Sequence, residues 1–222
     1  MTRRTASSRR RTARRLAAAG VVAVLATLVS GCGSSGDETS AASSLASITQ
    51  YQDMGSQPLG PATEQISQAT ESGTWSFSAP TGGKLTLLYF GYTSCPDVCP
   101  TTMADLASAL RSLPSDQADQ VWVQFVSTDP HRDTAARLTQ WIHHYSPTFH
   151  AGRAPIGTVI KAARSYGIGI ARPKVTRGDY QVTHGAELVV LDQQGRMVGY
   201  FKELASLKTY TAAIPTLIKD YA

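Results

Sequence analysis

The sequence contains few cysteines, no internal repeat and no long hydrophobic run. Its 222 residues include three cysteines, Cys32, Cys95 and Cys99, which excludes a small scaffold held together by several disulfides. The lack of a repeat argues against a solenoid or a propeller. No apolar run reaches the roughly 20 residues that a transmembrane helix comfortably needs. The chain must therefore fold around a hydrophobic core, and its rare cysteines stand out as candidates for chemistry.

Acidic residues are missing from the first 31 residues, which contain seven arginines. An apolar stretch, 16–29, follows the arginines and ends in small residues, a pattern typical of an export signal. Residues 28–32, Leu-Val-Ser-Gly-Cys, resemble a bacterial lipobox, in which the cysteine is lipidated and becomes the mature N-terminus. We therefore predict a lipoprotein signal peptide over 1–31 and a lipid anchor at Cys32. An ordinary signal peptide and an uncleaved N-terminal anchor are the alternatives, and both lead to the same compartment.

Positive charge is concentrated in this leader. The whole chain has a formal net charge of +5, but residues 32–222 contain 14 Lys and Arg against 16 Asp and Glu, a net charge of −2. A mature protein without a basic excess gives no reason to expect nucleic acid as a partner. We expect the protein on the outer face of the bacterial cytoplasmic membrane, held there by its lipid anchor.

The chain that follows the leader is long enough for one domain with a sizeable core. Residues 32–50 are rich in Gly, Ser, Ala and Thr, which predicts a flexible tether. Residues 51–222 form the predicted domain. Within it, 51–72 show no clear period and are expected to be irregular, whereas 74–78 alternate large and small residues, as in a hairpin arm.

Hydrophobic periodicity predicts strands and helices in the rest of the domain. The apolar run 85–90 is typical of a central strand covered by helices on both faces. Pro100 fits the first position of a helix, and Asp133 or Thr134 fits the cap of a later one. The expected strands are 85–90, 121–126, 186–191 and 196–201, and the expected helices are 100–113, one that follows the turn 129–134, 157–166 and 206–218. This order is typical of an α/β fold with a mixed sheet flanked by helices.

Cys95 and Cys99 lie four residues apart, directly after the first core strand. A thiolate is both the nucleophile in disulfide exchange and a strong ligand for soft metals. A structural disulfide is the third possibility, but a bridge across so short a loop removes little unfolded-state entropy. Since Cys99 is expected at a helix N-terminus, where the dipole stabilises a thiolate, it is predicted to have the lower pKa.

Three motifs carry a resemblance to a known family. They are Tyr-Phe-Gly-Tyr-Thr-Ser-Cys-Pro-Asp-Val-Cys-Pro at 89–100, Ser-Thr-Asp-Pro-His-Arg-Asp-Thr at 127–134 and Asp-Tyr-Gln-Val-Thr-His at 179–184. With these motifs, residues 84–221 resemble the Sco family, also called SCO/SenC, of thioredoxin-fold copper proteins. The resemblance implies a thioredoxin-like domain that binds copper through Cys95, Cys99 and His184.

The resemblance also implies a function. Two thiolates and an imidazole hold both Cu(I) and Cu(II), as a carrier requires. The implied role is that of a copper metallochaperone, not an enzyme in the turnover sense, which delivers copper to, or assembles, the dinuclear copper centre of a respiratory cytochrome c oxidase. Its partner would be the copper-receiving subunit of that oxidase, and the residues do not identify its copper donor.

Two other functions compete with copper delivery. A membrane-tethered thiol-disulfide oxidoreductase would use Cys95 and Cys99 as a redox pair that reduces the cysteines of a cuproprotein, and His184 need not then be a ligand. The Cys-x-x-x-Cys spacing differs from the Cys-x-x-Cys spacing of ordinary thioredoxins, which disfavours this as the sole activity. A peroxide-reducing enzyme would need a single activated cysteine with different neighbours, and the loop does not supply that pattern.

The remaining polar residues near the motifs are expected to have ordinary roles. Asp129 and Arg132 are expected to be turn and capping groups, although a loop near the site would also allow them to contact a partner. Four further histidines are expected to be ordinary surface or helix-end residues, namely His131, His143, His144 and His150.

Overall fold

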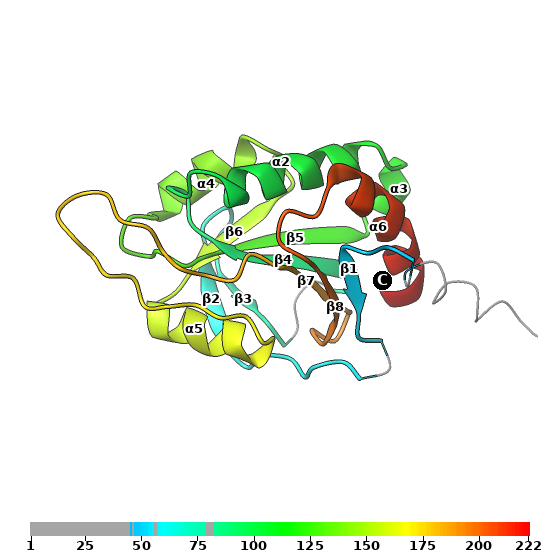
Figure 1. Ribbon diagram of the computed structural model, residues 1–222, viewed down its shortest axis with the longest axis horizontal. Coiled ribbons are helices and arrows are strands. Elements are labelled where there is room, and N and C mark those ends of the chain that lie inside the picture. The colour runs from blue at the N-terminus through cyan, green and yellow to red at the C-terminus, as the bar shows by residue number, and fades with distance from the viewer. Residues whose placement is uncertain (1–44, 46, 56, 79–81) are drawn as a thin grey trace, which may run out of the picture. The chain divides into compact units, whose positions relative to one another are not determined.

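A mixed eight-stranded sheet forms the centre of the fold (Figure 1). The computed structural model describes residues 45, 47–55, 57–78 and 82–222. The strands are β1 (Tyr51–Asp53), β2 (Gln65–Gln68), β3 (Thr74–Ser76), β4 (Leu85–Gly91), β5 (Val121–Ser127), β6 (His150–Arg153), β7 (Leu188–Leu191) and β8 (Met197–Phe201). The helices are α2 (Val98–Arg111), α3 (Ser115–Ala118), α4 (Ala135–His143), α5 (Ile156–Ser165) and α6 (Leu207–Tyr221).

Three parallel strands lie side by side in the middle of the sheet. The strand order is β1-β8-β7-β4-β5-β6-β2-β3. Strands β4, β5 and β6 run parallel, and the other neighbouring pairs are antiparallel. Because β7 runs antiparallel to β4, with Leu188 opposite Tyr89, the chain enters β7 beside the point where it leaves β4. Two loops that are far apart in the sequence therefore meet at one end of the sheet.

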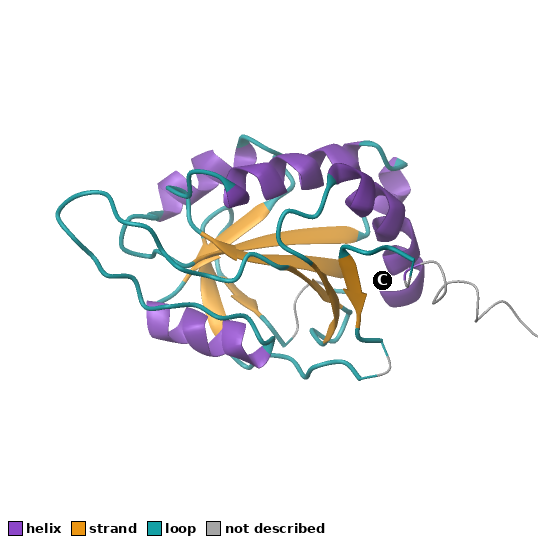
Figure 2. Ribbon diagram, in the orientation of Figure 1, coloured by secondary structure: helices purple, strands orange, loops and turns teal. Residues whose placement is uncertain are grey.

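Strand β4 is buried on both faces because helices cover both sides of the sheet (Figure 2). Alternate side chains of a strand point to opposite faces. Leu87 and Tyr89 accordingly belong to a cluster with α2, α4 and α6, whereas Leu88 and Phe90 belong to a second cluster with α5. The run 85–90 is confirmed as a central strand, and so is the α/β fold with a mixed sheet flanked by helices.

The helices begin close to the positions that the sequence predicts. Thr134 Oγ1 accepts a hydrogen bond from a backbone N–H at the start of α4, and Ser206 caps α6 in the same way. Helix α2 begins at Val98, two residues before the expected start at Pro100. Cys99 is therefore inside the first helical turn, as the second residue of α2.

The stretch 51–72 contains two strands, so the expectation that it is irregular is wrong. Strand β1 pairs with β8, and β2 pairs with both β3 and β6. Strand β6 is a further element that the periodicity did not predict. These strands are three or four residues long and are too short to show a period of two, so their distant partners define them. The hairpin arm expected at 74–78 is confirmed in the pairing of β3 with β2.

Packing of the domain begins before residue 51. Leu45 is 2% exposed and joins the core cluster on the α2 face of the sheet. Gln50 Oε1 accepts hydrogen bonds from Ser206 N at 3.1 Å and from Thr209 Oγ1 at 2.6 Å. The described end of the tether expected over 32–50 is therefore packed against the domain.

The leader expected over 1–31 and the anchor residue Cys32 lie outside the described residues. Within the described part of the chain, no helix is both long enough and apolar enough to cross a membrane. The signal peptide and the lipid anchor therefore stay predictions from the sequence.

Replacing Gln50 with alanine is expected to lower the free energy of unfolding by about 1–2 kcal/mol. The substitution removes the acceptor for groups at the start of α6 and so weakens the beginning of that helix. Urea denaturation followed by circular dichroism measures the change. Gln52→Ala is the matched control, because Gln52 is exposed and its amide donates to the neighbouring Asp53 carbonyl. An equal loss in both variants would contradict the capping role.

Candidate metal centre

The dithiol loop lies where β4 ends and α2 begins. Cys99 is buried in the core and Cys95 is half-buried, and both are free thiols. Gly91 ends β4, and a Cβ atom at this position would lie 2.9 Å from both Cys99 Sγ and Phe125 Cε2. Such a separation is too short for nonbonded atoms, so glycine is the residue that lets the thiol pack against the end of the strand.

His184 reaches the dithiol loop because β7 is antiparallel to β4. It precedes β7 and forms an isolated β-bridge with Ile170. His184 Nε2 lies 3.7 Å from Cys99 Sγ. The donor atoms of Cys95, Cys99 and His184 all lie within 4.8 Å of one another. The structure therefore brings together the three residues that the sequence predicts as metal ligands.

The orientation of the imidazole favours ligation through Nε2. His184 Nδ1 lies 2.9 Å from Gly185 O, and a ring nitrogen must carry its proton to donate to a carbonyl. The lone pair of Nε2 then faces the sulfur atoms. The rings of Tyr92 and Tyr89 meet the imidazole edge to face, at centroid distances of 5.7 and 6.3 Å, and restrict its rotation.

The pKa values of the two thiols are shifted in opposite directions. A hydrogen bond from the Cys99 thiol lowers the pKa of Cys95 to about 3 despite its partial burial. The interaction with Cys95, together with burial, raises the pKa of Cys99. Cys95 is therefore the thiolate, and Cys99 holds the proton. The expectation that Cys99 has the lower pKa is wrong, because burial and a neighbouring thiolate outweigh the helix dipole.

A buried carboxylate supports the dithiol loop. Asp133 is fully buried and accepts hydrogen bonds from Thr93 Oγ1 at 2.5 Å and from Ser127 Oγ at 2.6 Å. Burial raises the pKa of Asp133, and these hydrogen bonds oppose the shift. Arg137 on α4 also donates to Thr93 Oγ1, at 2.6 Å. Asp133, considered from the sequence as a helix cap, thus ties the loop to β5 instead, and Thr134 is the cap.

A second network holds the segment that precedes His184. Tyr180 Oη donates to Asp129 Oδ1 at 2.8 Å, and Arg132 Nη2 donates to Tyr180 O at 2.8 Å. The Arg132 guanidinium lies 3.7 Å from the centroid of the Tyr180 ring, which is a cation–π contact. Arg132 N also donates to Asp129 Oδ1, so the expected turn role of this pair is confirmed. The same pair positions the histidine loop.

Three tyrosines around the site were missed by the sequence reasoning. Tyr89 and Tyr92 contact the imidazole, and Tyr180 anchors the segment before it. Tyrosine is common in strands and loops, so the residue type alone did not indicate that these side chains lie beside the metal centre. Position was the available signal, because two of these tyrosines lie inside the dithiol motif and the third lies four residues before His184.

The other histidines lie apart from the three donors. His131 and His144 are exposed and His143 ends α4, as expected. For His150 the expectation of a surface or helix-end residue is wrong. It is half-buried on β6, where its ring stacks on Trp122 at a centroid distance of 3.4 Å and burial lowers its pKa. Among the described residues, the one group of three or more Cys, His, Asp or Glu side chains arranged to hold a metal is formed by Cys95, Cys99 and His184.

Fold and site together define a class of protein. It is a thioredoxin-like domain in which two cysteines after the first core strand and a histidine before a distant strand form a candidate centre for a soft metal. The particular family follows from the sequence. The chain belongs to the SCO1/SenC family, whose sequence model matches residues 64–219, so the predicted membership is confirmed.

Individual relatives agree with this assignment. The mitochondrial SCO2 homolog of Bos taurus is 29% identical over 134 residues, which cover 60% of this chain and 50% of that protein. The mitochondrial SCO1 homolog 1 of Arabidopsis thaliana is 27% identical over 139 residues, which cover 63% of this chain and 42% of that protein. The match therefore spans about half the length of these relatives.

A solved structure extends the similarity to three dimensions. The copper-bound structure of Bradyrhizobium japonicum ScoI is 30% identical to this chain and superposes with a TM-score of 0.61. The similarity covers 73% of this chain and 98% of the ScoI chain. The described domain therefore shares the fold of that ScoI structure.

Iodoacetamide is expected to alkylate Cys95 and to leave Cys99 unmodified in the reduced, metal-free protein. Cys95 is partly exposed and ionised, whereas Cys99 is buried and protonated. Because the pKa of Cys95 is about 3, its thiolate persists as the pH falls. Its alkylation rate should fall less than about tenfold between pH 8 and pH 5, where an ordinary thiol slows about a thousandfold.

A Cys32→Ser background removes the third thiol, and tandem mass spectrometry locates the label. Cys99→Ala is the informative control, because it removes the hydrogen bond that lowers the pKa of Cys95. Alkylation of Cys95 should then become strongly dependent on pH. Faster labelling of Cys99 than of Cys95 would contradict the assignment.

Proposed function

We propose that this protein carries one copper ion on Cys95, Cys99 and His184. The observation that carries the proposal is the convergence of their donor atoms within 4.8 Å. Sulfur suits Cu(I), and thiolates with an imidazole also suit Cu(II). The Cys95 thiolate and the Nε2 lone pair are ready to bind, and Cys99 gives up its proton when the metal arrives.

The unequal exposure of the ligands suits a carrier that releases its metal. Cys95 is half-buried, whereas Cys99 is fully buried. A thiolate of a donor or an acceptor approaches the copper ion from the Cys95 side and replaces one ligand at a time. Cys99 and His184 hold the ion meanwhile. Copper then passes between proteins without being released into solvent and without opening the core.

The client in this proposal is a respiratory cytochrome c oxidase. Membership of the SCO1/SenC family supports it, since the resemblance to the Sco family implies assembly of the dinuclear copper centre of that enzyme. The copper bound in the similar ScoI of Bradyrhizobium japonicum supports copper as the cargo. The protein would deliver copper to the copper-receiving subunit of the oxidase, or prepare that subunit's cysteines for it.

Thiol-disulfide exchange is a second function, favoured by the opposite acidities of the two thiols. The Cys95 thiolate would attack a client disulfide, form a mixed disulfide and release one client thiolate. Cys99 would then lose its proton and attack the Cys95 sulfur, which releases the second client thiolate and leaves a Cys95–Cys99 disulfide. Two electrons pass to the client, and the pair must be reduced again before it binds copper.

The place of action in this proposal is the outer face of the bacterial cytoplasmic membrane. The arginine-rich leader and the lipobox-like residues 28–32 support export and lipidation at Cys32. The Gly- and Ser-rich residues that follow Cys32 would let the domain reach a membrane-bound client.

Replacing His184 with alanine is expected to weaken copper binding. The wild-type protein should bind one copper ion per chain, and His184→Ala should raise the Kd for Cu(II) by at least about tenfold, because an imidazole ligand is lost. Titration against a competing chelator, performed separately for Cu(I) and Cu(II), measures the change. His131→Ala is the matched control, because His131 is exposed and should leave both affinities unchanged. Cys95→Ala and Cys99→Ala should abolish tight binding.

The same variant separates the two functions. Equal copper affinity of the wild-type protein and His184→Ala would contradict the three-ligand site. If His184→Ala then also reduces a client-derived disulfide peptide at the wild-type rate, the oxidoreductase function accounts for the dithiol. Loss of copper binding with unchanged disulfide exchange would assign His184 to the metal alone.

Metabolic labelling is expected to place a fatty acid on Cys32. Cells expressing the full chain are fed an alkyne-tagged fatty acid, and the purified protein is examined for the tag. The wild-type protein and Cys95→Ser should carry it, whereas Cys32→Ser should not, because the lipobox-like cysteine is the acceptor. An unlabelled wild-type protein would rule out the lipid anchor.

A further inference from the structure

Charge is distributed very unevenly along the described chain. Residues 134–178 contain seven Lys and Arg and no Asp or Glu, whereas 45–133 and 179–222 together contain seven basic and 14 acidic residues. A chain of balanced charge does not need such a segregation in order to fold, since net charge concerns association more than architecture. The acid-free segment comprises α4, β6, α5 and the first part of the loop that follows α5, up to residue 178.

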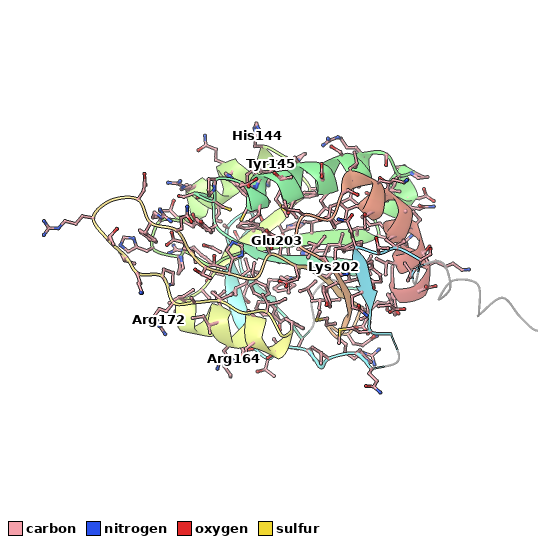
Figure 3. The ribbon with its side chains drawn as sticks, viewed as in Figure 1. His144, Tyr145, Arg164, Arg172, Lys202 and Glu203 are labelled. Atoms are coloured by element: carbon pink, nitrogen blue, oxygen red, sulfur yellow. The ribbon has the colours of Figure 1, made fainter. Side chains whose placement is uncertain are left out.

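Six of the seven cations in this segment are exposed. Arg137 is hydrogen-bonded to the dithiol loop, and four others matter here, namely Arg164, Arg172, Lys174 and Arg177. In the part of the chain that the structure describes, none of the four forms an ion pair. Lys161, by contrast, is paired with the buried Glu64 at 2.7 Å. Arg164 is on α5, and Arg172 lies beside this helix on the loop that follows it (Figure 3). These cations are thus available to an anionic surface.

The segment 171–183, which we call the basic loop, lies between α5 and β7 in the chain. It projects beyond the helices and strands of the domain (Figure 1). It carries Arg172, Lys174 and Arg177, together with one exposed acid, Asp179. It also carries Val175, which is 51% exposed and is one of three large hydrophobic side chains that are exposed in the described chain. An apolar side chain between cations is typical of a surface that becomes buried against another protein.

The base of the basic loop is the metal centre itself. Ala171 N donates to Thr183 O at 2.9 Å, and Ile170 pairs with His184 in an isolated bridge. On the other side of the centre, Arg137 of the acid-free segment donates to Ser94 Oγ at 2.9 Å, directly before Cys95. A partner that covers the basic loop down to its base therefore reaches His184 and the half-buried Cys95.

We propose that the basic face, formed by Arg164, Arg172, Lys174, Val175 and Arg177, docks an acidic protein surface on the partner that exchanges copper at Cys95. That the partner exchanges copper rests on the proposed function. That its docking surface is acidic rests only on the positive charges of the basic face. A protein is the occupant that these observations favour, because a partner that reaches Cys95 must itself offer copper ligands. A lipid surface offers none, and the face lacks the aromatic residues with which proteins enter a bilayer interface. Complementary charge would steer the encounter and raise its rate.

The test measures association of the full-length, copper-loaded protein with the soluble copper-binding domain of the oxidase subunit from the same organism. The variant Arg172→Glu/Arg177→Glu should lower the association rate constant at least about tenfold at low salt. The matched control Lys208→Glu/Lys219→Glu changes the net charge equally at two exposed lysines of α6, and it should change the rate less than about twofold. The difference should shrink as salt is added. Both variants should retain one copper ion per chain.

Several outcomes would overturn the docking face. These are equal slowing by the two variants, no slowing by either, or no association of the wild-type protein with the oxidase domain. A fourth is binding to phosphatidylglycerol vesicles that depends on Arg172 and Arg177 while protein association does not. Association is also measured with copper-free protein. If the partner docks through the basic face but receives no copper, the docking face stands and copper delivery fails.

Discussion

The antiparallel register of β7 against β4 is the constraint on which the metal centre depends. It sets Leu188 opposite Tyr89, so the residues before β7 must lie at the end of β4, where the chain turns into α2. Burial of both strands on both faces makes this register expensive to change, since a shift by one residue would exchange the two faces. His184 is therefore held near Cys95 and Cys99 by the sheet, and not by its own loop alone.

Two hydrogen-bond networks around the metal centre fix the positions of the loops that the β4–β7 register brings together. Asp133 fixes the dithiol loop to β5, and the contacts of Asp129 and Arg132 with Tyr180 fix the segment before His184. Both networks use residues of one turn between β5 and α4. One short segment thus positions both halves of a three-donor site, which is the arrangement that tight metal geometry requires. Within the site the two thiols differ in exposure and in pKa.

Some elements of the fold and the site were predictable from the sequence and others were not. The continuous apolar run 85–90, the cap at Thr134 and the motif around Cys95 and Cys99 were readable because each depends on neighbours in the chain. Strands β1, β2 and β6 were not, because three or four residues carry no period and their partners are distant. The prediction that Cys99 has the lower pKa was wrong for a related reason. Burial and the adjacent Cys95 thiolate raise the pKa of Cys99 more than the helix N-terminus lowers it.

The sequence by itself determined the order of the main helices and strands, the family and the identity of the three candidate ligands. These properties are local, because a motif or a periodic pattern is complete within a few residues. Only the tertiary structure decided that the three donors converge, that Cys95 is the thiolate, and that the two ends of the basic loop meet beside His184. Each of these depends on distances between residues far apart in the chain, which strand pairing and burial set and which no local pattern records.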